Sequence, residues 1–207
     1  MRKILFVLAL FFVIPFTVFA KAPDRAGETD AGFGVAARYA KDGDWHDTVY
    51  LSGSVTRGIT PWLAVGVSGG WTDSGLDVNP GNGAGKFRGT RLAATPVFGD
   101  VILRTPAGDW PVIPYADLGL GMMISHTHGD GVLNNNNLES HSNDGFAMKF
   151  GGGVDWFVTD NWIYNVEIAY VLTSADVEFK NRGTQAVVDT ADLDFWYIGG
   201  ALKYRFS

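Results

Sequence analysis

The chain has 207 residues, a formal net charge of −6 and no cysteine. The acidic balance argues against a nucleic-acid partner, which would normally require a basic patch. Without cysteine there is neither a disulfide framework nor an acceptor for a lipid anchor. Glycine is abundant, with 27 residues, and aromatic residues make up 14% of the chain. No cofactor is expected.

The chain begins with the features of a secretion signal. Arg2 and Lys3 precede an apolar run, and small residues stand where a signal peptidase reads, up to Ala20. We therefore expect a signal peptide over 1–20 and a mature domain over 21–207. The alternative is an uncleaved membrane anchor, because the run is about as long as the shortest spanning helix.

The first half of the mature chain contains four segments in which apolar and small or polar residues alternate. Side chains alternate between the two faces of a strand, so this period of two predicts strands with one apolar face. The segments are about Ala31–Lys41, Asp47–Gly58, Trp62–Asp73 and Gly89–Arg104.

The fourth segment changes phase near Pro96. Leu92 and Ala94 indicate one apolar face, whereas Val101 and Leu103 indicate the other. A β-bulge at Pro96 would reconcile the two, because one extra residue flips every later side chain. Proline also cannot donate to a ladder, so Pro96 is a candidate break in the wall.

The second half contains four more alternating segments, and its connections differ in length as in the first half. The segments are about Tyr115–Ser125, Gly145–Val158, Trp162–Thr173 and Trp196–Phe206. The connections expected at one end are 59–61, 105–112 and 159–161, and those expected at the other end are 42–46, 74–87, 126–144 and 174–190, of which all but 42–46 are long. An even number of strands with short turns at one end and long loops at the other is typical of outer-membrane barrels.

The last segment gives the strongest evidence for the class of protein. Its even-numbered side chains are apolar, with Tyr204 and Phe206 at the end, whereas Lys203 and Arg205 lie on the other face. Aromatic residues also cluster at the ends of other segments, as interface girdles do. We predict an all-β fold, an eight-stranded antiparallel transmembrane β-barrel in up-and-down order, with Tyr204 and Phe206 as the insertion signal. A soluble β-sandwich or a lipocalin-like barrel is the alternative.

The face opposite the apolar one places several charges in the lumen. An eight-stranded barrel is just wide enough for side chains to fill, so these charges are expected to form ion pairs. A conduit or gate for small solutes is the other interpretation. Lys203 and Arg205 would pair with acidic residues of the same set. The set is Arg38, Asp117, Lys149, Asp155, Glu167, Lys203 and Arg205.

The histidines fall in the long loops. Imidazole and carboxylate groups suit a divalent transition metal. Such loops are also often merely solvated, so no metal site is expected, and the weak candidates are His126, His128, Asp130 and His141.

Three stretches resemble the OmpW-type and related small eight-stranded outer-membrane barrels: Ile113–Gly121, Gly151–Trp162 and Lys203–Phe206. The chain departs from the usual pattern in having Ala116, where the family often has glycine, and Ser207 after the terminal aromatic residue. The resemblance implies a porin-like protein that passes small hydrophobic molecules sideways into the membrane.

A second, superficial resemblance concerns Glu139–Asn143, which is similar to the His-x-Ser-Asn motif of PagL-type lipid A deacylases. Here His141 and Ser142 are adjacent, so on a strand they would point to opposite faces. That spacing does not suit a histidine base that activates the serine. We therefore expect no enzymatic activity.

The sequence thus predicts a porin-like protein of the Gram-negative outer membrane that passes or binds small hydrophobic molecules. The expected partners are outer-membrane lipids and lipopolysaccharide, the barrel-assembly machinery and a hydrophobic solute. The alternative functions are a structural or surface-interaction barrel with a plugged lumen and partner-binding loops and, more remotely, a lipid-modifying enzyme.

Overall fold

The computed structural model describes residues 25–41, 45–78, 87–106, 110–128, 133 and 137–206. The expected signal peptide over 1–20, Ser207 and Asp130 lie outside these residues. Within them, no helix is long and apolar enough to cross a membrane.

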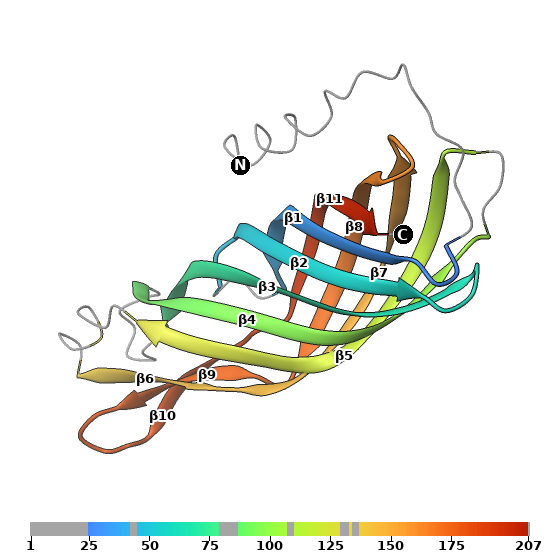
Figure 1. Cartoon of the computed structure of the whole chain (residues 1–207). Coiled ribbons are helices and arrows are strands. Elements are labelled where there is room, and N and C mark those ends of the chain that lie inside the picture. Colours follow the sequence, from blue (N-terminus) through green and yellow to red (C-terminus); the bar gives the residue numbers. More distant parts are fainter. Residues whose placement is uncertain are drawn as a thin grey trace.

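Eight strands form a closed antiparallel barrel in the order β1-β11-β8-β7-β5-β4-β3-β2 (Figure 1). The predicted fold class is confirmed. The barrel strands are β1 (Thr29–Ala40), β2 (Thr48–Gly58), β3 (Leu63–Val78), β4 (Phe87–Arg104), β5 (Val112–His128), β7 (Gly145–Phe157), β8 (Trp162–Thr173) and β11 (Phe195–Phe206).

The outer face of the barrel is apolar and the inner face is mixed. Phe33, Leu120 and Phe150 are about half exposed on the outside, although large apolar side chains of soluble proteins are normally buried. This is the inverse of a lipocalin, whose apolar face lines the interior. Of the aromatic residues predicted to form the girdles, Trp156 is only partly exposed. The others are exposed: Tyr39, Trp62, Trp71, Trp162, Tyr204 and Phe206.

Two of the expected long loops contain strands of their own. β6 (Leu138–Asn143), β9 (Asp176–Asn181) and β10 (Val187–Asp192) form a second sheet in the order β10-β9-β6. It lies at the end of the barrel away from the C-terminal end of β11 (Figure 1). With the chain ends on the periplasmic side, this small sheet marks the extracellular end. Sequence alternation missed these strands because their residues are mostly polar.

The bulge predicted at Pro96 is wrong. β4 pairs with β5 without interruption from Arg91 to Arg104, and its offset to β3 is the same on both sides of Pro96. Leu92 and Ala94 point into the lumen, as Phe98 does, and are fully buried. These inward side chains are apolar because the lumen at their level is apolar. The apparent change of phase in the sequence therefore reflects a change from apolar to polar side chains along the lumen face of β4.

Candidate functional site: the barrel lumen

The periplasmic end of the lumen is closed by a chain of ion pairs. Lys203 Nζ lies 3.0 Å from Asp155 Oδ1, and Arg25 Nη1 donates to Asp155 Oδ2 at 2.6 Å. Arg25 also donates to Asp30, and Arg205 Nε lies 3.3 Å from Asp30 Oδ1. All five side chains are buried. The predicted partnership of Lys203 with Asp155 is present in this chain, whereas Arg205 contacts Asp30 and Glu28, which the sequence did not single out.

One aromatic ring on the periplasmic side, that of Phe157, supports this chain of ion pairs. Phe157 lies between two guanidinium groups, with Arg25 Cζ at 5.6 Å and Arg205 Cζ at 4.9 Å from the ring centroid. Ile113 and Ile163 pack with Phe157 in a small buried cluster. Charges held this tightly, with apolar side chains around them, leave a periplasmic end that is packed and not open.

The middle of the lumen centres on Lys149. Its Nζ lies 2.9 Å from Asp100 Oδ1 and 2.6 Å from Asp117 Oδ2, and it donates to Ser68 Oγ at 3.0 Å. The two carboxylates come from neighbouring strands, β4 and β5, and the lysine comes from β7. The predicted contact between Lys149 and an acidic lumen residue is therefore found with Asp117, and Asp100 is an additional partner.

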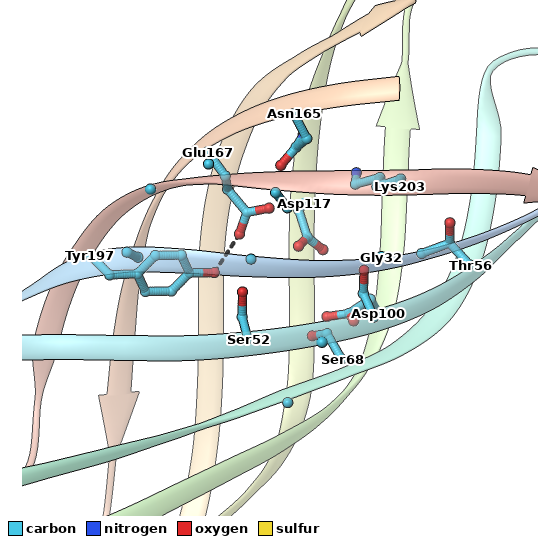
Figure 2. A pocket seen from close by; sticks show the side chains of 18 of the residues that line it. Gly32, Ser52, Thr56, Ser68, Asp100, Asp117, Asn165, Glu167, Tyr197 and Lys203 are labelled. Carbon is cyan, nitrogen blue, oxygen red and sulfur yellow. Dashed lines mark hydrogen bonds between the residues drawn. The ribbon is translucent and has the colours of Figure 1, made fainter. Parts of the chain in front are cut away.

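Glu167 is held by hydroxyl groups and not by a cation. Tyr115 donates to Glu167 Oε2 at 2.6 Å, and Tyr197 donates to Oε1 (Figure 2). Among the described residues, no cation lies within the 4 Å that defines an ion pair with Glu167. Asn165 donates to Tyr115 at 3.0 Å and to Asp155 at 2.9 Å, so it connects this group to the periplasmic chain.

A cavity of about 60 Å³ lies among these side chains. Figure 2 shows its lining residues pointing inward from strands around the barrel. Since a buried water needs roughly 10–15 Å³ of such volume, the cavity has room for a few waters but not for a continuous channel.

The extracellular half of the lumen is mainly apolar, although Arg38, Thr72, Ser74, Thr90 and Ser125 are also buried there. Its fully buried side chains come from the barrel wall and also from the second sheet, so the loops fold back into the mouth. Members of this cluster are Trp45, Leu76, Val78, Leu92, Phe98, Met123, Leu133, Val171, Val177, Phe179, Leu193 and Phe195. The lumen therefore has two chemically distinct halves.

The β3–β4 ladder lacks two pairs beside Pro96, whereas the β4–β5 ladder is continuous there. The pairs Gly69–Val97 and Thr72–Ala94 have the same offset, but the two pairs between them are missing from the β3–β4 ladder. Proline has no N–H to donate, which accounts for a gap there. On the lumen side, a Cβ added at Gly70 would lie 2.3 Å from the Tyr50 ring, so this aromatic side chain packs directly against the gap.

The histidines do not form a metal site in the described part of the chain, where no group of three histidine or acidic residues gathers. His128 Nε2 lies 3.6 Å from Asp73, and His126 Nδ1 contacts the Ser125 carbonyl oxygen at 2.7 Å. His141 is opposite Glu178 in the second sheet.

No His–Ser pair of the deacylase type is assembled either. Ser142 Oγ donates to the Ser125 carbonyl oxygen at 3.0 Å, and its neighbour His141 lies on the other face of β6.

A closed eight-stranded barrel with a lipid-compatible outside, a filled lumen and extended extracellular strands defines the small outer-membrane barrels. The chain belongs to the family described as "Outer membrane protein beta-barrel domain", which matches residues 6–206. The protein is thus an outer-membrane protein of the Gram-negative type.

Several solved barrels share the fold. The outer membrane protein OprG from Pseudomonas aeruginosa has a TM-score of 0.76 and 14% identity, covering 89% of this chain and 98% of that one. AlkL, solved in DMPC bilayers, has a TM-score of 0.62 and 16% identity over 94% and 97%. Outer Membrane Protein W of E. coli has a TM-score of 0.57 and 18% identity over 89% and 100%. The resemblance to OmpW-like barrels is therefore confirmed at the level of family and fold. No curated protein sequence matches significantly.

Proposed function

We propose that this protein admits small hydrophobic molecules from the outside and releases them sideways into the membrane, without enzymatic action. The observation that carries the proposal is the division of the lumen. The extracellular half offers an apolar environment, and the periplasmic half is closed by the chain from Lys203 to Arg205 through Asp155, Arg25 and Asp30.

This division supports a lateral route for a simple physical reason. An apolar molecule gains free energy in the extracellular half, at about 25 cal/mol per Å² of apolar surface removed from water. Moving on toward the periplasm would bring it among buried charges whose hydrogen bonds it cannot replace. The gap in the β3–β4 ladder at Pro96 lies near the periplasmic edge of the apolar cluster, and the Tyr50 ring covers it on the lumen side.

The outside of the gap faces the membrane. Trp71 and Val97 are each more than 40% exposed there. A molecule that moves past Tyr50 would therefore leave the apolar cluster and enter lipid without crossing a polar layer.

The test is uptake of a hydrophobic solute by lipid vesicles that contain the purified barrel. Pro96→Ala supplies the missing N–H donor, so we expect the β3–β4 ladder to close and uptake to slow several-fold, with unchanged folding. Pro114→Ala is the matched control, because Pro114 lies on the outer face at the periplasmic end of β5. Equal uptake by the wild type and Pro96→Ala would contradict the lateral route.

A second candidate, a structural or surface-interaction barrel, is favoured by the closed periplasmic end and by the folded extracellular sheet of β6, β9 and β10. The same experiment separates the two functions. Vesicles with the wild-type barrel that take up no more solute than empty vesicles would favour this second function.

A further inference from the structure

Arg38 is a charged residue that the lumen network does not use. It projects from β1 into the apolar extracellular half and is 0% exposed. Its Nη2 donates to the carbonyl oxygen of His46, but Nε and Nη1 have no hydrogen-bond partner among the residues that the structure describes. No described carboxylate lies within the 4 Å that defines an ion pair with it. The ion-pair role predicted for Arg38 is therefore not what the structure shows.

A buried guanidinium with two unused donors is unfavourable in an otherwise apolar environment. Burial of an unpaired charge costs several kcal/mol, and each unused N–H adds to this. Besides the His46 carbonyl oxygen and the attraction of the Asp47 carboxylate, two aromatic faces compensate in part: Trp45 lies with its ring centroid 3.5 Å from Arg38 Cζ, and Phe195 lies at 5.7 Å. Such a residue calls for an acceptor from outside the described protein, which a water or a ligand can supply.

Trp45 covers Arg38 from the extracellular side. It is 2% exposed and contacts the Phe195 ring edge to face at 5.7 Å. The segment that carries it is attached to the top of β3 by a bridge between Trp45 and Leu76 and by a hydrogen bond from His46 N to the Gly75 carbonyl oxygen at 3.0 Å. The same segment is also held by the side chains of Ser74, Asp77 and Arg38, which contact His46. The indole ring thus fills the place that an apolar ligand above Arg38 would take.

We propose that Arg38 binds the anionic head of an amphipathic ligand, a carboxylate on a medium-length hydrocarbon chain, after that ligand displaces the Trp45 ring. The fork of a guanidinium matches the two oxygens of a carboxylate, and the surrounding cluster matches an alkyl tail. This inference rests on the proposed function, since it names the class of hydrophobic molecule that the extracellular half selects.

The test compares octanoate with octanol, which have the same tail length but different heads. Binding to the full-length barrel in lipid nanodiscs is measured by equilibrium dialysis, with empty nanodiscs subtracted. We expect the wild type to bind octanoate at least about tenfold more tightly than octanol, the preference that one charge-assisted hydrogen-bonded pair supplies. Arg38→Met should reduce the preference to about one and retain octanol binding.

Three further variants complete the test. Arg57→Gln removes an exposed arginine of the next strand, β2, and should retain the wild-type preference. Trp45→Ala removes the covering ring, so both ligands should bind more tightly while octanoate remains preferred. If Arg38→Met does not fold, Arg38→Lys, which keeps the charge but loses the fork, should show a reduced preference.

The possible failures are distinguishable. A wild type that binds neither octanoate nor octanol contradicts the proposed function. A wild type that binds both equally, or an Arg38→Met variant that keeps the preference, leaves the proposed function intact and overturns the role of Arg38.

Discussion

Replacement of Lys149 by methionine tests whether the charges in the middle of the lumen act as one unit. Because Asp100 Oδ1 and Asp117 Oδ2 contact the same nitrogen at 2.9 and 2.6 Å, these oxygens lie at most about 5.5 Å apart. At an effective dielectric constant of about 20, two such charges repel by about 3 kcal/mol. In the wild type, Lys149 offsets this repulsion.

We therefore expect Lys149→Met to lower the free energy of unfolding by about 3–5 kcal/mol, the range found when one partner of a buried pair is removed. Combining it with Asp100→Asn and Asp117→Asn removes the uncompensated charges and should recover most of the loss. The assay is reversible urea unfolding of the barrel in lipid vesicles at neutral pH, followed by tryptophan fluorescence.

Lys180 provides a control in which a lysine pairs with one carboxylate and both side chains are partly exposed to solvent. Its Nζ lies 2.8 Å from Glu178 in the extracellular sheet, where the hydrogen bond from Lys180 lowers the pKa of the Glu178 carboxyl. Solvent screens this pair, so Lys180→Met should have a far smaller effect. Equal destabilisation by the two lysine variants would refute the argument, as would a triple variant no more stable than Lys149→Met alone.

Two other expectations concern the inner face of the wall. Gly199→Ala should destabilise the barrel by about 1–3 kcal/mol through overpacking, because the new Cβ would lie 2.3 Å from Ala36 Cβ. The control Gly53→Ala, whose new Cβ would have its nearest atom at 3.8 Å, should have little effect. An equal fall in the urea midpoints of the two variants would exclude overpacking as the cause. Tyr197→Phe should cost about 1.5–3 kcal/mol in the same assay, since Glu167 loses one of its two hydroxyl donors. A midpoint as high as that of the wild type would show that water replaces the hydroxyl.

The strands of the barrel could be predicted from sequence because the membrane imposes one rule on every strand. Lipid requires an apolar outer face, so the period of two is regular outside, and it placed Arg38, Lys149 and Lys203 in the lumen. The alternation in the sequence misassigns the inward and outward faces only in the extracellular part of β4. There Leu92 and Ala94 are apolar on the inside, and a rule based on one apolar face cannot tell inside from outside.

The pairing of the lumen charges could not be predicted from sequence. Which charges meet depends on the register and on the direction of long side chains across the barrel, and neither leaves a periodic signal. Arg25 precedes the first strand and Asp100 lies in the segment of disputed phase, so both were overlooked. The sequence places Trp45 in a connection between strands, where burial is not expected. The ring is buried because that connection folds into the mouth of the barrel.

The chain of charges at the periplasmic end also joins the two ends of the polypeptide. β1 pairs with β11, and the contact from Arg205 to Asp30 crosses that seam over a sequence separation of 175 residues. Before β11 arrives, Asp30 lacks its Arg205 partner and the edge of β1 has no ladder partner on that side. Closure of the barrel is therefore coupled to completion of the barrel sequence. A chain that lacks β11 leaves the edge of β1 unpaired and the periplasmic charge cluster incomplete.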